Sequence, residues 1–359
     1  MASTMWSGEE RGPSHILLAL ATLLHFAVDG VCAANLARYA WDEPRLEPIL
    51  LYFGIYNLIA FGGQWAMGWW LDCRSRHIAP SLILSSLLLA AGCLEGLGIL
   101  WQAVFLALGN CLFHSAGGSL ILRGSRNFSE PGIFVSSGAV GLALGLYGFC
   151  GITPFLLLCL AGGAALAALV HFRGLPEFAV ADPIASDEAA PRDTGTAALV
   201  FAAFLLLACV VLRGANGGGT SGYVLLFPCV FALGKVLGGL CADHFGYNKT
   251  VLAIFLLGFL ALQWQGLLPA LLLALSWNMT MPLTLRLLHR CRPDRPGLMF
   301  GLAAGCLLPG YFFREHLTVL PGLLIVLQFL ALSFTGWLLL VRGAAGTGGQ
   351  SKSDSSSVP

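Results

Sequence analysis

The feature that most constrains this chain is a series of apolar stretches of about 20 residues, each almost free of charge and divided from the next by short polar or glycine-containing segments. About 20 apolar residues in a helix span the hydrocarbon core of a bilayer. Only 10% of the 359 residues are charged and the mean hydropathy is +0.81, whereas a soluble domain carries roughly 25% charged residues. The sequence therefore predicts an all-α, polytopic membrane protein whose leucines and phenylalanines face lipid.

Twelve spans are expected along the chain, in two sets of six. The first set covers about 15–38, 48–70, 79–97, 101–122, 131–149 and 153–172, and the second about 197–213, 222–241, 249–264, 267–289, 296–312 and 317–341. The long polar stretch between the sets is typical of a linker. The expected organisation is an N-terminus 1–14, a six-helix half 15–172, a linker 173–196, a six-helix half 197–341 and a disordered tail 342–359.

The basic residues predict the orientation. With both termini placed in the cytoplasm, most of the 19 Lys and Arg residues fall in inside segments, while Arg38, Arg45 and Arg314 fall outside. This asymmetry is the positive-inside rule. It favours a cytoplasmic N-terminus, linker and tail, in a protein of the plasma membrane, or inner membrane if the source is bacterial.

A loop motif occurs once in each half. Gly68 is followed four residues later by Asp72 and then by Arg76, and Gly239 is followed by Asp243 and then by Gly246. The two loops hold the same place in their halves. A repeated six-helix unit is the architecture of transporters that rock two halves around a substrate site at the membrane midplane.

The duplicated Gly-x-x-x-Asp loop resembles the signature loop of the major facilitator superfamily. Within that superfamily, the segments Leu24–Asp29, Phe113–Gly117 and Gly132–Gly145 resemble the fosmidomycin-resistance-type branch. The resemblance implies a major-facilitator-type fold, in which Asp72 and Asp243 bind neighbouring helix ends and gate the inward closure, together with Gly68, Arg76, Gly239 and Gly246. Span five lacks the Gly-Pro step associated with antiporters, because Leu146 follows Gly145.

Three ionisable side chains in the first half are candidates for proton coupling. His25 and Asp29 are four residues apart, so they lie on the same face of their helix. His114 lies in the middle of span four. Ionisable groups inside a membrane require a partner or a wet cavity, and a histidine can hand on the proton of a carboxylate. The alternative is that these groups are hydrogen-bonded only to hold the helices together.

Arg213 ends a long apolar run in span seven, so it is either a cavity cation for an anionic substrate or a side chain that extends to the interface. Extension to the interface is also expected for Lys235 and Arg286, each near the end of its span.

The expected function is secondary transport of a small organic solute, anionic or drug-like, with proton coupling and no cofactor or metal. The alternative is a transporter fold that acts as a sensor or scaffold. No HExxH, GxSxG or GxxxxGK[ST] motif occurs, which argues against an enzyme or an ATP-driven pump. The expected partners are the solute, protons and lipid, not nucleic acid, and a monomer is expected.

Overall fold

Every secondary-structure element that the structure describes is helical. The structure is a computed structural model and describes residues 15–175, 195–215, 223–317 and 321–341. The expected N-terminal segment 1–14, most of the linker and the tail 342–359 therefore lie outside the described residues. All 11 cysteines fall within them and are free thiols.

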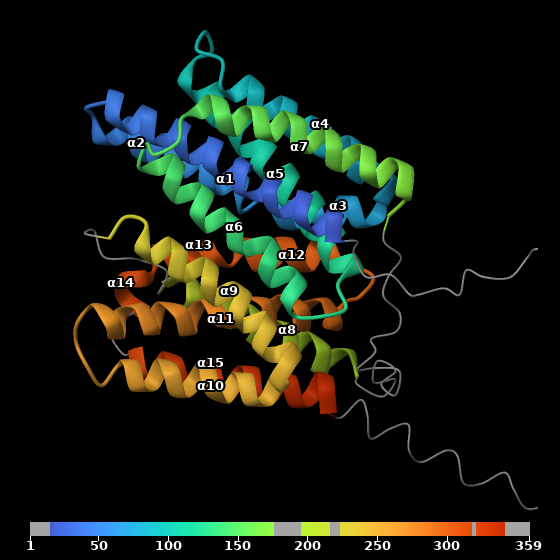
Figure 1. The fold of residues 1–359 in the computed structure, drawn as a ribbon, viewed down its shortest axis with the longest axis vertical. Helices are drawn as coiled ribbons and strands as arrows, with labels where there is room; N and C mark the ends of the chain where they lie inside the picture. Colours follow the sequence, from blue (N-terminus) through green and yellow to red (C-terminus); the bar gives the residue numbers. More distant parts are fainter. Residues whose placement is uncertain (1–14, 176–194, 216–222, 318–320, 342–359) are drawn as a thin grey trace, which may run out of the picture.

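The first half of the chain forms one group of helices. These are α1 (His15–Asp42), α2 (Leu46–Ala60), α3 (Gln64–Cys73), the 3-10 helix η1 (Ser75–His77), α4 (Ile78–Gly92), α5 (Ile99–Gly124), α6 (Ser129–Leu146) and α7 (Ile152–Arg173). Figure 1 shows them together in blue to green.

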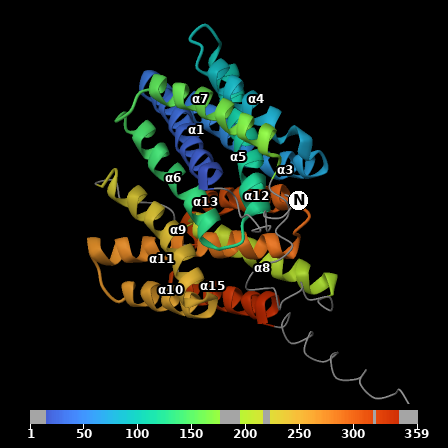
Figure 2. The ribbon, with the colours of Figure 1, turned by 45° about the vertical axis from the view of Figure 1, so that its right-hand side comes forward.

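The second half forms the other group. It consists of α8 (Thr196–Ala215), α9 (Leu226–Phe245), α10 (Tyr247–Ala261), α11 (Leu267–Cys291), α12 (Pro296–Gly305), α13 (Leu307–Phe312), α14 (Arg314–Leu317), α15 (Pro321–Gly336) and the π-helix η2 (Trp337–Val341). The two groups remain distinct after a 45° turn (Figure 2).

The outer helices present apolar side chains outward. Leu50, Leu58 and Phe204 are among the large hydrophobic residues that are more than half exposed. Nine helical stretches in the described residues are long and apolar enough to cross a membrane. Shorter apolar helices (α4, α10 and α12–α13) lie where the remaining spans are expected. The chain is an integral, multi-pass membrane protein, and the count of twelve crossings remains a prediction.

Two expected spans are broken, and the sequence explains both breaks. The span predicted at 48–70 is interrupted between α2 and α3, where Gly62 and Gly63 weaken the helix. The span predicted at 296–312 is interrupted as well, because helix α12 ends at Gly305 and α13 begins at Leu307. Pro309 has no N–H to donate to the carbonyl four residues before it, which is that of Gly305. The proline therefore breaks the helix one turn before its own position.

The two groups meet through a small set of helices. Across the boundary, α3 and α5 pack on α12, α6 packs on α9, and α11 contacts α5 and α6. The ends of α7 and α8 that flank the linker, Arg173 and Thr196, lie on one side of the molecule (Figure 1). We call this side the linker face and the other side the opposite face.

Candidate functional site

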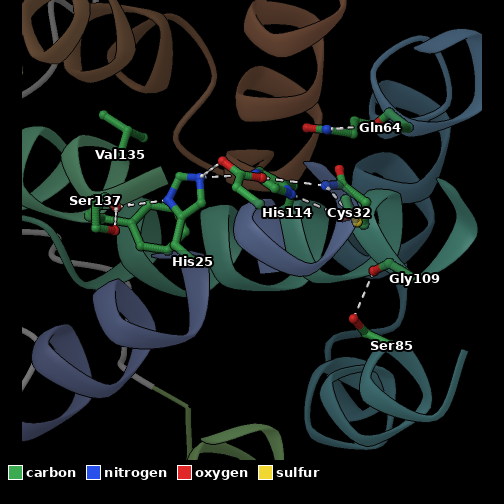
Figure 3. A network of polar contacts seen from close by, with 12 residues as sticks. His25, Cys32, Gln64, Ser85, Gly109, His114, Val135 and Ser137 are labelled. Atoms are coloured by element: carbon green, nitrogen blue, oxygen red, sulfur yellow. Dashed lines mark hydrogen bonds and ion pairs between the residues drawn. The ribbon is translucent and has the colours of Figure 1, made fainter. Parts of the chain in front are cut away.

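The candidate site is built from two helices that each contribute one pair of polar side chains. Helix α1 carries His25 and Asp29, and helix α5 carries Asn110 and His114. Each pair has the i, i+4 spacing that puts both side chains on one helix face. Helix α6 packs along α1 and covers the pairs. The fold therefore brings together the three residues that the sequence singled out in this half, of which Figure 3 shows His25 and His114.

The polar atoms of this cluster lie within contact distance of one another. The Nε2 atom of His25 is 3.3 Å from Asp29 Oδ2, and the Nε2 atom of His114 is 3.4 Å from Asp29 Oδ1. The two Nε2 atoms are 2.9 Å apart. The amide of Asn110 donates to Asp29 Oδ1 at 3.4 Å. We call His25, Asp29 and His114 the His–Asp cluster.

Backbone carbonyls determine the role of each imidazole nitrogen. The Nδ1 atom of His25 lies 2.8 Å from the carbonyl oxygen of Phe134, and the Nδ1 atom of His114 lies 3.0 Å from that of Asn110. A carbonyl oxygen only accepts, so both Nδ1 atoms must carry hydrogen. If both imidazoles were neutral, each Nε2 atom would carry a lone pair, and the two lone pairs would face each other. Their 2.9 Å contact needs a cation between them, and a proton shared by the two rings, with Asp29 as counter-ion, meets that need.

The cluster is tightly enclosed but reachable. His25 is 5% exposed and His114 is 7% exposed, whereas the Asp29 side chain keeps 16% of its surface open. Gly138 of α6 lies against the cluster so closely that an added Cβ would overlap both Asp29 Oδ2 and the His25 ring. The carboxylate is thus the part of the cluster that a proton from solvent can reach.

The same three side chains are the candidate place for a metal ion. Among the described residues, His25, Asp29 and His114 form a group whose ligand atoms lie within 4.8 Å of one another. Two imidazole nitrogens and one carboxylate oxygen are a ligand set that first-row transition metals accept. The sequence predicted no metal here, because the two helices that supply the ligands are far apart along the chain.

Lys235 reaches the boundary between the halves and does not extend to the membrane interface as expected. Its Nζ atom donates to the carbonyl oxygen of Val135 on α6 at 3.0 Å. Its charge interacts with those of both Asp29 and Arg213. Arg286 also differs from the expectation, since it is 4% exposed and donates to the carbonyl oxygen of Arg126 in the first half.

Arg213 is buried and not extended into water. It is 4% exposed, and its Nη1 atom donates to the hydroxyl of Thr284 on α11 at 3.4 Å. Its Nη2 atom is buried and has no hydrogen-bond partner among the described residues. Burial shows that Arg213 does not extend into water, and its role as a cation for an anionic substrate remains a prediction.

The two loop aspartates lie at the linker face, each bound to a helix of the other half. Asp72 of α3 accepts from the backbone N–H groups of Gly297 (2.9 Å) and Leu298 (2.8 Å), at the start of α12. Asp243 of α9 accepts from those of Phe128 (2.7 Å) and Ser129 (2.9 Å), at the start of α6. A carboxylate is stabilised at a helix N-terminus, where N–H groups are free and the helix dipole is positive. We call these two contacts the interhalf caps.

The glycines of the two loops permit this close approach. A Cβ at Gly68 would overlap the backbone carbonyl of Gly297, and a Cβ at Gly239 would meet the backbone of Phe128 and Ser129. Gly246 ends α9 with a φ of 89°. Arg76 is exposed, and its hydrogen bond goes to His77 and not to Asp72.

Four polar residues of these sites were not found by sequence reasoning. Asn110 donates to Asp29 of the cluster, Lys235 binds the carbonyl oxygen of Val135 at the boundary between the halves, and Ser119 and Arg123 lie beside Asp72, at 3.3 and 3.9 Å. Asn110 had a usable signal, because it lies one turn before His114 and so on the same helix face. Lys235 had a signal as well, as a lone cation inside an apolar run.

A hollow opens at the opposite face, beyond the cluster. It has a volume of about 530 Å³ and is lined by Asn35, Arg38, Tyr39, Asp42, Glu43, Glu95, Leu97, Ile99 and Gln102. Asn35 follows Asp29 by less than two turns of α1. The hollow therefore lies toward the opposite-face end of the helix that carries His25 and Asp29.

Comparison with solved structures identifies the fold. A major facilitator superfamily transporter, FucP, in its outward conformation is 13% identical, with a TM-score of 0.59 over 89% of this chain and 99% of its own. A structure of the E. coli fucose:proton symporter FucP gives 13% identity and 0.60 over 90% and 99%. A bacterial homologue of the iron transporter ferroportin, outward-facing with soaked iron, gives 14% and 0.55 over 92% and 99%. No protein-family model and no curated protein matches the sequence. The chain has the fold of the major facilitator transporters.

Proposed function

We propose that this protein is a major facilitator secondary transporter of the plasma membrane, which moves a small organic solute coupled to protons through the His–Asp cluster. Rocking of the two halves would open the midplane to each side in turn. The motifs around His25, His114 and Gly132 favour the fosmidomycin-resistance-type branch, and a monomer is sufficient because the cluster comes from one chain.

One observation carries the proton coupling: the two Nε2 atoms at 2.9 Å, whose Nδ1 atoms are both committed to carbonyl oxygens. The charged or titratable groups that face Asp29 are His25, His114 and Lys235. Loss of the shared proton leaves two lone pairs in contact and one unshielded carboxylate. Protonation of the cluster therefore changes the net charge that the first half presents to Lys235 of the second half and to a bound solute.

The test is transport by the purified chain in lipid vesicles. Vesicles loaded with the protein, under an imposed pH gradient and with EDTA present, are exposed to a mixture of cellular metabolites, and their contents are identified by mass spectrometry. At least one solute is expected to accumulate against its gradient, and only when the pH gradient is present. EDTA ensures that a bound metal does not cause the response.

The variant Asp29→Asn removes the carboxylate and is expected to abolish accumulation while leaving downhill exchange. Asp42→Asn is the matched control, because Asp42 lies on the same helix and is exposed. If no solute accumulates with the pH gradient, or if Asp29→Asn behaves as wild type, the proton-coupled proposal is wrong. Loss of every flux would support the sensor or scaffold alternative.

A further inference from the structure

We propose that the transported solute is a small organic anion, whose carboxylate binds the guanidinium of Arg213 with Lys235 as the second cation. This inference rests on the proposed function and names the class of its substrate. The carboxylate is a group that a planar guanidinium binds through two parallel hydrogen bonds.

The first support is the state of Arg213. A buried guanidinium needs a partner for each donor, since an unpaired buried charge is strongly destabilising. Within the part of the chain that the structure describes, Arg213 has one long hydrogen bond, to a neutral hydroxyl, and its Nη2 atom has none. At 4% exposure it cannot be satisfied by bulk water. A buried guanidinium with an unused donor is suited to bind an anion.

The second support is the distribution of negative charge in the second half. The carboxylates in its described residues are those of Asp243, Asp294 and Glu315. Asp243 is bound to the start of α6, Asp294 pairs with arginines of its own loop, and Glu315 lies in α14 next to the opposite face. Among the described residues, none of the three hydrogen-bonds to or pairs with Arg213 or Lys235, and these two cations repel each other. Two neighbouring cations without a carboxylate of their own half leave room for an anion.

The third support is the link to the His–Asp cluster. Asp29 is the carboxylate whose charge reaches Lys235. When the cluster holds its shared proton, the negative charge of Asp29 is balanced by the imidazoles, and Lys235 loses its counter-ion. The carboxylate of an incoming solute then replaces Asp29 as the counter-ion of Lys235. Anion binding and proton binding should strengthen each other by the same factor, because a coupling between two sites is reciprocal.

The test is equilibrium binding to the purified full-length protein in detergent with EDTA, measured by calorimetry. The probes are lactate and succinate, each compared with its neutral amide, lactamide and succinamide. We expect at least one acid to bind, its amide to bind about tenfold more weakly or not at all, and the acid to bind more tightly as the pH falls from 8 to 6.

Arg213→Gln is expected to weaken binding of that acid about tenfold or more. Lys235→Gln should weaken it less and remove its pH dependence. Arg213→Lys keeps the charge without the planar fork and should give an intermediate loss. Arg173→Gln, at an exposed helix end, is the matched control and should bind as wild type. Equal melting temperatures of the variants without ligand, or higher ones for Arg213→Gln, exclude misfolding.

The proposal is overturned if neither acid binds, if the amides bind as well as the acids, or if Arg213→Gln keeps the affinity of the wild type. These outcomes do not depend on a pH gradient or on transport. Failure of the anion class is therefore distinguishable from failure of proton coupling, which the vesicle experiment with Asp29→Asn decides.

Discussion

At the scale of single residues, the His–Asp cluster shows how backbone partners decide side-chain chemistry. The carbonyls of Phe134 and Asn110 fix both Nδ1 atoms as donors and so turn both Nε2 atoms toward one shared cation. The spacing of His25 and Asp29 was enough to place them on one helix face. Their meeting with His114 was not predictable from spacing, because it depends on the packing of α5 beside α1.

Gly138→Ala should disrupt the cluster without changing any polar group. The added methyl would overlap Asp29 Oδ2 and the His25 ring, so α6 or the ring has to move. Forcing a methyl into a packed interior costs about 1–3 kcal/mol. We expect a lower melting temperature and lower proton-driven accumulation than in wild type.

Gly54→Ala is the control for that variant, because a Cβ at Gly54 meets nothing within 4 Å. It should melt at or slightly above the wild-type temperature, since alanine favours the helix. Equal behaviour of the two alanine variants would show that α6 is not packed on the cluster as described.

Arg213→Gln should raise the stability of the protein without ligand, which is unusual for a change inside a helix bundle. The variant removes a buried charge that has one long hydrogen bond and no carboxylate partner. A gain on the order of 1 kcal/mol is expected, and thermal unfolding in detergent measures it. Arg173→Gln should leave the melting temperature unchanged. A marked loss of stability in Arg213→Gln would indicate that the arginine holds the helices together.

At the scale of elements, the interhalf caps come from a repeated sequence motif whose aspartates were evident, whereas the helices that they bind were not. The repeated loops predicted two equivalent aspartates, and the resemblance to the major facilitator superfamily implied helix-end contacts for them. The sequence alone could not show which helices they bind, because the starts of α12 and α6 lie far from them along the chain. The ends of helices were less predictable. Pro309 cannot donate a hydrogen bond to the carbonyl of Gly305, so helix α12 ends one turn before the proline.

Asp72→Ala and Asp243→Ala should each favour opening of the linker face. Each removes a carboxylate that accepts two backbone N–H groups, a change expected to cost the closed state about 1–3 kcal/mol. Spin labels at Arg76 and Arg292, both exposed and in different halves, report the opening as a longer distance.

Asp294→Asn is the control on the same face, because Asp294 pairs with exposed arginines of its own loop. Exposed pairs of this kind contribute little to stability, so the distance distribution should match that of wild type. If the two alanine variants also match it, the interhalf caps do not hold the linker face closed.

At the scale of the whole molecule, the sequence predicted the membrane class, the two sets of helices and the fold. Composition sufficed for the class, and the repeated loop indicated the architecture. The way the two halves pack on each other could not be predicted from the sequence. Contacts such as that of α6 with α9 bury glycines and backbone, which carry no hydrophobic pattern.

Joining the halves at the linker face should stop transport. The guanidinium of Arg295, before α12, lies 2.9 Å from the thiol of Cys73 at the end of α3. The variant Arg295→Cys, treated with a short bismaleimide, should lose transport while still binding solute from the opposite face. The same variant with Cys73→Ser cannot be joined at this point and should remain active after treatment. Continued transport by the joined protein would contradict rocking of the halves.

The reciprocal arrangement of the interhalf caps has a consequence for kinetics. Each half provides one carboxylate and one helix start, so the halves cannot separate at this face unless both caps break in the same event. Neither cap contains a residue of the His–Asp cluster or Arg213. Substitutions in the caps should therefore act on the rate of turnover through the balance between the closed and open linker face, while the solute's own contacts in the binding site stay the same.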